Sequence, residues 1–354
     1  MSTQTQANPE HLAAFIAAIF VALKLPADAA RIVADTLVHA DLEGIPSHGV
    51  MLVPMYAERI RAGSVSLATE AVVASDRGSA LVLDAQNALG QLSSRQAVQL
   101  LCERAPKHGL AAVAVRNAFH FGTAGKWAAE LALQGLIGVV MSNTRPLMPA
   151  PGGAERVVGN NPIAIAMPAA GRAPVVFDMA TSASAMGKIR LAAGAGQAIP
   201  EGWATDVTGN ATTDAAEAIK GMLLPAAGPK GFGLAFMIDL FCGGLSSGAI
   251  ADAVRPLYGD PALTYGCAHF FLAVDVAHFC ARDTFEAAVG AFSAKVEASA
   301  RAPGVDRIFS PGGPALQTRQ SHAKACPLAP DTTKQLIALA ASLGLPATDI
   351  FKHS

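Results

Sequence analysis

Charged residues are scarce in this sequence, and they do not cluster by sign. Only 15% of the residues are charged, the formal net charge is −1, and no run of lysine or arginine interleaved with aromatic side chains occurs. Binding of nucleic acid depends on a positive surface that neutralises phosphate groups. The composition therefore argues against a nucleic-acid partner.

Long apolar runs are also lacking. A membrane-spanning helix needs about 20 consecutive apolar residues. The most apolar segment near the N-terminus, residues 12–23, is only about a dozen residues long and follows Glu10 instead of a basic region. We therefore expect no insertion into a membrane.

Cysteine and histidine patterns for disulfides or metals are absent as well. The five cysteines lie far apart and form no Cys-x-x-Cys pair. Such usage is typical of a reducing compartment, so we predict a cytoplasmic protein. The nine histidines show no His-Glu-x-x-His spacing, and the sequence predicts no metal site.

The usual nucleotide-binding motifs are missing. No Gly-x-Gly-x-x-Gly follows a predicted strand, and the nearest run, Gly228-Pro-Lys-Gly-Phe-Gly233, has the wrong spacing. No Walker lysine motif and no Gly-x-Ser-x-Gly elbow occurs either. A nucleotide, if one binds, must be held by another arrangement.

Apolar residues, by contrast, are abundant and make up 52% of the chain. This share indicates apolar surface that is buried between subunits, so we expect a homo-oligomer. The length of 354 residues predicts two domains.

The pattern of secondary structure changes along the chain. The first 70 or so residues predict helices over residues 9–23, after Pro26, and from Ser47 to about Arg61. After Gly78, short β-rich runs alternate with helices, which predicts an α/β layer. Predicted strands cover residues 80–84, 110–115, 136–141, 174–178 and 270–274, the last two as buried strands, and predicted helices cover 94–107, 123–134, 231–244, 284–300 and 331–343.

The segment from Asp41 to Val50 holds the candidate catalytic residues. Gly44 and Pro46 end the preceding helix, and Ser47 is a predicted N-cap of the next one. His48 would then lie at a helix N-terminus, where an imidazole of ordinary pKa about 6.5 suits general acid or base catalysis. The alternative is a capped helix with a histidine on its surface.

Other stretches predict contacts with an anionic or hydroxyl-bearing ligand. Thr123 is a predicted helix cap at a strand-to-helix turn, and Asp178 leaves a strand with Thr181 and Ser182 close behind. Lys230 precedes a helix, against the helix dipole, which a bound anion would explain. Ordinary turn chemistry and a solvated lysine are the alternatives.

Taken in order, these motifs resemble the type-2 malate/L-lactate dehydrogenase family, whose members include sulfolactate dehydrogenases, ureidoglycolate dehydrogenases and cyclic ketimine reductases. The resemblance covers most of the chain. The motifs that carry it are Ser47–Val50, Asn117–Gly125, Ser142-Asn143, Gly159–Pro162, Asp178–Ser182, Ile199–Ala204 and Lys230–Leu234.

The resemblance implies a non-Rossmann α/β fold and a homodimer that holds NAD or NADP in a cleft. A helical domain of residues 1–75, completed by about 285–354, would adjoin an NAD(P)-binding α/β domain of residues 76–284. His48 would be the proton donor and Ser47 would belong to its hydrogen-bond relay. The family's cofactor-binding residues fall on His120, Phe121, Gly122, Asp178, Met179, Ala180, Pro229, Lys230, Pro311 and Gly312.

The substrate-binding residues depart from the family pattern. The arginine usually found four residues after the catalytic histidine is Leu52 here. A buried carboxylate needs replacement hydrogen bonds, which guanidinium supplies best. Arg145 is our candidate, with Lys126 as second choice, and we expect Leu52→Arg to restore part of the binding; Asn160 and Lys188 are further substrate candidates. The alternative is a solvated Arg145 and a less polar substrate.

The sequence thus predicts an NAD(P)-dependent oxidoreductase that transfers a hydride between nicotinamide and a small 2-oxo or 2-hydroxy acid or a cyclic imino acid. A noncatalytic ligand-binding relative with the same fold is the alternative. The sequence favours neither NAD nor NADP. In Rossmann proteins an acidic residue contacts the ribose and indicates the cofactor, but the position of such a residue cannot be located in a different fold.

Overall fold

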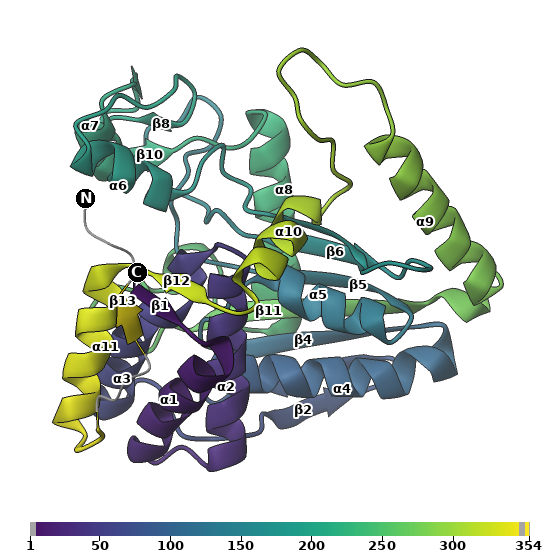
Figure 1. Ribbon diagram of the computed structural model, residues 1–354, viewed down its shortest axis with the longest axis horizontal. Helices are drawn as coiled ribbons and strands as arrows, with labels where there is room; N and C mark the ends of the chain where they lie inside the picture. The colour runs from purple at the N-terminus through teal and green to yellow at the C-terminus, as the bar shows by residue number, and fades with distance from the viewer. Residues whose placement is uncertain (1–4, 347–350, 354) are drawn as a thin grey trace.

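A seven-stranded mixed sheet forms the centre of the computed structural model, which describes residues 5–346 and 351–353 (Figure 1). Its strand order is β2-β3-β4-β11-β5-β6-β7. The strands are β2 Val72–Asp76, β3 Ala80–Asp84, β4 Leu110–Ala118, β5 Leu136–Ser142, β6 Ile163–Met167, β7 Val175–Met179 and β11 Cys267–Asp275. Only β3 and β4 pair in parallel. This differs from the parallel sheet of a Rossmann fold, as predicted.

Helices cover both faces of the sheet. Alternate side chains of a strand point to opposite faces, and β11 shows this directly: Phe271 joins the main core with α4 Gly90–His108 and α5 Ala124–Leu133, whereas Phe270 packs with Ile238. Ile238 lies on α8 Pro229–Asp239, which continues as the π-helical turn η3 Leu240–Gly244. The central position of β11 explains why Cys267–Phe271 are all buried.

The strand β7 corrects one prediction. Residues 174–178 were expected to form a buried strand, but β7 is the last strand of the sheet and pairs only with β6. Phe177 is 42% exposed as a result. An apolar run of this length does not reveal whether its strand is central or lies at an edge.

A helical layer built from both chain ends packs against the sheet. It contains α1 Pro9–Ala22, α2 Ala27–Leu42, α3 Val53–Ala62, α10 Gly313–His322 and α11 Pro330–Ser342. Strand β1 Thr5–Ala7 pairs with β12 Cys326–Leu328 on one side and with β13 Phe351–His353 on the other. Figure 1 shows the purple N-terminal and yellow C-terminal segments side by side. The predicted fold class is confirmed.

The remaining segments extend from this core. After β7, α6 Met186–Gly194, α7 Ala215–Lys220 and the small sheet of β8 Ala204–Thr205, β9 Ala211–Thr212 and β10 Met222–Leu223 share a separate apolar cluster. Helix α9 Arg282–Glu297 lies at the opposite end of the molecule from α1 and α11 (Figure 1). Short 3₁₀ turns occupy η4 Ala251–Ala253 and η5 Val276–His278. Within the described residues, no helix is both long and apolar enough to cross a membrane.

Candidate active site

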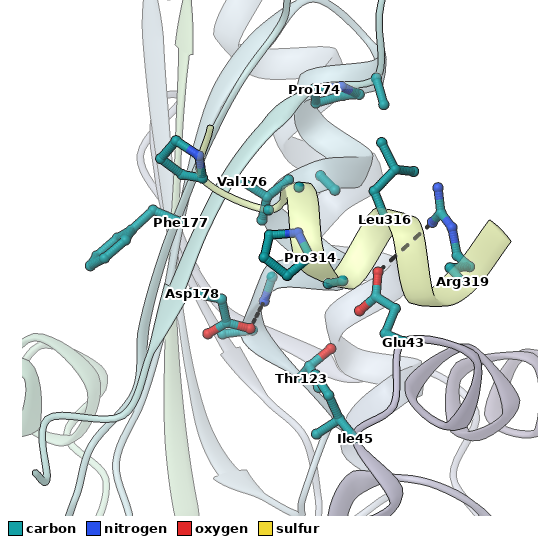
Figure 2. A pocket seen from close by; sticks show the side chains of 18 of the residues that line it. Glu43, Ile45, Thr123, Pro174, Val176, Phe177, Asp178, Pro314, Leu316 and Arg319 are labelled. Carbon is teal, nitrogen blue, oxygen red and sulfur yellow. Dashed lines mark hydrogen bonds and ion pairs between the residues drawn. The ribbon is translucent and has the colours of Figure 1, made fainter. Parts of the chain in front are cut away.

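A cavity of about 610 Å³ lies where the helical layer meets the sheet. Separate chain segments form most of its wall: the end of α2 and the turn that follows (residues 39–48), helix α5, strand β7, and the start of α10. Figure 2 shows Asp178 of β7, Thr123 before α5 and Pro314 of α10 around the same space. Its volume falls within the range of about 300–1,000 Å³ that is usual for small-molecule sites.

The turn that carries Ser47 and His48 differs from the prediction. Pro46–His48 form a 3₁₀ turn, η1, and Val50–Leu52 form a second one, η2, so that α3 begins only at Val53. Ser47 makes no capping hydrogen bond. Gly49 interrupts the helix because it is extended, with φ −98° and ψ −155°. The predicted Ser47 cap is therefore wrong, and His48 ends a short turn instead of beginning an α-helix.

A buried carboxyl group fixes this turn. Asp41 of α2 is only 4% exposed, and its Oδ2 accepts a hydrogen bond of 2.7 Å from the Val50 N–H. Burial raises the pKa of Asp41 to about 7, while the hydrogen bond from Val50 lowers it in part. A Cβ atom on Gly49 would lie 2.3 Å from the Asp41 carboxyl group. Only glycine fits between α2 and the turn.

This close approach yields a prediction. Gly49→Ala must push the turn away from Asp41, so we expect a loss of about 1–3 kcal/mol in the free energy of unfolding and a large loss of turnover. Urea denaturation and a rate assay measure the two effects. Gly194→Ala is the matched control, because a Cβ atom there meets open space. Equal stability and activity of Gly49→Ala and Gly194→Ala would contradict the role assigned to Asp41 and Gly49.

The imidazole of His48 is neutral near pH 7. Burial lowers its pKa to about 4. The Ser47 hydroxyl oxygen lies 3.0 Å from His48 Nδ1, and the His48 and His120 rings lie 5.2 Å apart between centroids. The pKa of His120 is held well below its usual value, mainly by burial and further by His48 and His269. Two neutral histidines therefore meet at one edge of the cavity.

Behind this pair, His269 of β11 is fully buried. Its ring stacks on Phe121 at 4.2 Å, and its Nε2 lies 3.4 Å from Cys267 Sγ. Burial lowers the pKa of His269 to about 3, well below the unfolded value of 6.5. The unfolded chain therefore takes up a proton as the pH falls below about 6.5, whereas the native protein does not.

This shift predicts an acid-sensitive stability. At about pH 5 the unfolded-state protonation of one such histidine costs about 2 kcal/mol of stability, and His269→Phe should remove that cost. Asp41 and Asp178 act in the opposite direction, since their pKa values are raised to about 7 and about 6. The measurement is therefore the difference in pH dependence between variant and native protein, from urea denaturation at about pH 7.5 and pH 5. Replacing the exposed His11 is the control. No difference for His269→Phe would refute the burial argument.

The far side of the cavity offers hydrogen-bond donors. Thr123 precedes α5, but its Oγ1 is buried and has no hydrogen-bond partner among the described residues. The Gly125 N–H donates to Asp178 Oδ2 at 2.8 Å. The Asp178 side chain lines the cavity, and the surrounding protein raises its pKa to about 6. On the opposite wall, α10 begins after Gly312 in a left-handed conformation, with φ +84°.

This donor set fits a nucleotide. The free N–H groups and positive dipole end of a helix attract phosphate oxygens, and both α5 and α10 begin at the cavity. The unpartnered Thr123 hydroxyl and the Asp178 carboxylate suit the hydroxyl groups of a ribose. Within the described part of the chain, no group of three or more His, Cys, Asp or Glu residues could hold a metal ion.

The structure gathers some of the predicted cofactor residues and separates others. The cavity is lined by His48, Gly122, Asp178, Met179, Ala180, Pro311 and Gly312. Ser47 and His120 adjoin His48. The Phe121 side chain belongs to the core at 3% exposure. Pro229 and Lys230 begin α8 on an exposed surface outside the cavity lining, and Lys188 is exposed on α6.

The predicted substrate residues Arg145 and Asn160 lie on two loops that are tied together. Asn160 Oδ1 accepts a hydrogen bond of 3.1 Å from the Thr144 hydroxyl. The half-buried guanidinium of Arg145 has no hydrogen bond or ion pair with any described residue, and burial together with Arg156 and Arg190 lowers its pKa. Arg145 is not part of the cavity lining. Leu52 is 1% exposed and packs into the core.

Sequence reasoning missed several residues around the cavity. Arg172 and Arg319 line it, and each is paired with a carboxylate: Arg172 with Glu297 at 2.6 Å and Arg319 with Glu43 at 3.9 Å. Arg319 lies on α10, a helix with little apolar periodicity that we did not predict. No motif joins these residues, so only the folded chain reveals them.

Comparison with known proteins gives a consistent result. A family model described as malate/L-lactate dehydrogenase matches residues 7–337. A malate dehydrogenase of Pyrococcus abyssi is 35% identical over 89% of this chain and 88% of its own length. An NAD(+)-dependent ureidoglycolate dehydrogenase of Escherichia coli is 33% identical over 87% of this chain and 88% of its own. The solved structure of sulfolactate dehydrogenase from Methanocaldococcus jannaschii superposes with a TM-score of 0.92 at 31% identity, covering 98% of this chain and 99% of that one.

Proposed function

Because this chain belongs to the malate/L-lactate dehydrogenase family, we propose that it transfers a hydride between NAD or NADP and a small 2-oxo or 2-hydroxy acid or a cyclic imino acid, with His48 as proton donor. The observation that carries this proposal is the cavity itself. It exposes a neutral histidine at one edge and two helix N-termini with a ribose-compatible carboxylate at the other.

The cofactor proposal rests on the donors described above. Thr123 Oγ1, the positive dipole ends of α5 and α10, and Asp178 would hold the cofactor, and the nicotinamide when bound supplies or accepts the hydride. Proposals for Pro229 and Lys230 have less support, since both lie outside the cavity lining. The ratio of kcat/KM for NADH and NADPH with one accepted substrate decides between the two cofactors.

The protein's own contribution to the chemistry is proton transfer. A neutral His48 accepts the hydroxyl proton when a 2-hydroxy acid is oxidised, and it must first gain a proton to act as donor when an oxo or imino acid is reduced. Since burial lowers its pKa to about 4, the rate of reduction should rise as the pH falls toward that value. Ser47 keeps a hydrogen bond to Nδ1 and orients the ring.

Substrate binding is proposed to involve Arg145 and Asn160. An unpaired, half-buried guanidinium between other positive charges favours an anionic ligand. Since Arg145 lies outside the cavity lining, a carboxylate bound there must belong to a substrate that reaches beyond the cavity edge. A substrate without a carboxylate at that end remains the alternative.

A homodimer is proposed from the outer face of α8 and the turn that follows. Its exposed apolar residues are Leu234, Phe236, Met237, Leu240, Phe241 and Leu245. Apolar surface gathered in this way is typical of a subunit interface. Sedimentation velocity of the native protein tests the dimer.

The decisive experiment for the function is a panel of 2-oxo acids and cyclic ketimines, each assayed for oxidation of NADH and of NADPH. Turnover with at least one pair supports the proposal. Binding of a cofactor without turnover on any member would instead favour the noncatalytic relative.

A further inference from the structure

A fully buried tyrosine contacts the second histidine of the site. Tyr56 lies on α3 and is 0% exposed. Its hydroxyl oxygen is 2.7 Å from His120 Nδ1, although the two residues are 64 positions apart in the chain. Burial raises the pKa of Tyr56 far above its usual value, so the phenol keeps its proton and remains able to donate.

Two further N–H groups fix the direction of this hydrogen bond. The Gln91 side chain of α4 donates from Nε2 to the Tyr56 hydroxyl oxygen at 3.3 Å. The Gly122 backbone N–H donates to His120 Nδ1 at 3.4 Å. A backbone N–H is only ever a donor, so Nδ1 must be an acceptor. The Tyr56 hydroxyl oxygen also lies 3.5 Å from the His120 carbonyl oxygen, but its 2.7 Å contact with Nδ1 is much shorter. The Tyr56 proton therefore points to Nδ1, and the ring proton of neutral His120 lies on Nε2.

We infer that Tyr56 and Gln91 are positioning residues that hold His120 as the neutral Nε2–H tautomer, so that His48 alone takes up and releases the proton of the reaction. The inference rests on the proposed function for its effect on rate, but the tautomer itself does not depend on it. The chain of donors runs in one direction, from Gln91 Nε2 through the Tyr56 hydroxyl to His120 Nδ1.

The charge of His120 matters because of its neighbours. Its ring faces His48 from η1 at 5.2 Å, His269 lies on the β11 side, and Tyr56 faces it from α3. Were His120 to gain a proton, a cation would lie beside His48 and oppose the protonation of His48. The donor of the reducing direction would then be scarce at any given pH. A hydrogen bond that occupies the Nδ1 lone pair opposes this protonation, in the same direction as burial.

Helix α4, which carries Gln91, offers a way to reverse the direction of these hydrogen bonds. Gln91→Glu replaces the donor Nε2 by a carboxylate oxygen of nearly the same shape, which would accept the Tyr56 proton. The phenol oxygen would then accept from His120, and the ring proton would move from Nε2 to Nδ1. Gln96→Glu is the matched control: it adds the same carboxylate to α4, but Gln96 bonds only to the backbone of Ala71.

The test is nitrogen NMR on protein labelled with ¹⁵N-histidine, with the His120 signals assigned by their loss in His120→Gln. In the native protein we expect the protonated shift at Nε2 and the unprotonated shift at Nδ1. Gln91→Glu should exchange the two, and Gln96→Glu should leave them unchanged. Native His120 protonated at Nδ1, or no exchange in Gln91→Glu, would overturn the inference.

A kinetic test complements it. Tyr56→Phe removes one oxygen atom and leaves the ring packing; we expect the reduction rate at neutral pH to fall about tenfold, with the rise in rate on acidification displaced to lower pH. Tyr265→Phe is the control, because Tyr265 is a buried residue whose hydroxyl forms no hydrogen bond with any described residue. A Tyr56→Phe variant with native rate and pH profile would refute the positioning role. If no substrate of the panel is turned over, the proposed function fails, and the NMR result still decides the tautomer.

Discussion

Replacing His48 with alanine is expected to reduce turnover by about 10²–10⁴-fold while the affinity for the cofactor stays nearly unchanged. His48 lines the cavity and carries a neutral, half-buried imidazole with its Nδ1 held by Ser47. General acid or base catalysis acts on the transition state and contributes little to ground-state binding, so kcat should fall and the dissociation constant should not. Stopped-flow rates together with cofactor titration by fluorescence measure both.

Two companion variants sharpen this result. Ser47→Ala should cost much less than His48→Ala, because the structure shows no helix cap at Ser47 and leaves it only the hydrogen bond to the ring. His120→Ala separates the two histidines, since His120 lies beside His48 but not in the cavity lining. If His48→Ala kept half the native rate while His120→Ala lost it, the proton donor would be His120.

The second large effect is expected for substrate affinity. Arg145→Ala should raise KM for a carboxylate substrate by about 10- to 100-fold, because a charge-assisted hydrogen bond in a partly buried site contributes about 1.5–3 kcal/mol. The half-buried guanidinium lacks any ion pair with the described residues, so its loss should disturb the fold little. Steady-state kinetics and thermal unfolding of the same preparation measure both consequences.

Arg190→Ala is the control for this variant. Arg190 is an exposed arginine whose charge also acts on Arg145, so it tests for a general loss of positive field. We expect its KM to change by less than about threefold, as is usual for an exposed charge. Unchanged kinetics in Arg145→Ala would end the proposal and indicate a substrate without a carboxylate at that end.

The burial of Leu52 revises one expectation. Leu52→Arg was expected to restore carboxylate binding, but the Leu52 side chain is 1% exposed and belongs to the main apolar cluster. An arginine placed there would bury a charge without a partner, which is strongly unfavourable. Loss of stability is therefore the expected outcome of that substitution.

The sequence predicted best those features that depend on neighbouring residues. Helix α1 begins at Pro9 as predicted, where Asn8 accepts hydrogen bonds from the N–H groups of Glu10 and His11 at 3.0 and 3.2 Å, and Gly44 follows the end of α2 in a left-handed conformation. The edge position of β7 could not be predicted, because strand order is set by long-range pairing. The helix expected at Ser47 failed because Asp41, across the turn, determines the backbone of Gly49 and Val50.

The site was predictable only in part for the same reason. The motifs around His48, Gly122 and Asp178 are each a continuous stretch of sequence, so each could be recognised, and the fold brings all three to one cavity. Tyr56 of α3 contacts His120, and Gln91 of α4 contacts Tyr56. No spacing in the sequence indicates either contact. The role of Lys230 was inferred from the helix dipole and from the family resemblance, yet α8 begins at an exposed surface outside the cavity lining.

The cavity wall formed by α10 has a consequence for biosynthesis. Residues 310–316 and residues 39–48 line the same cavity, although they are far apart in the chain. Strand β1 pairs with β12, which lies later still in the chain. A nascent chain emerges from the ribosome N-terminal end first. The partners that α2 and β1 find in α10 and β12 are therefore translated only after the whole central sheet. The cavity is therefore complete only after α10 has been translated, so a nucleotide cannot bind the complete site during the early steps of folding. A chain interrupted before α10 lacks one wall of the cavity.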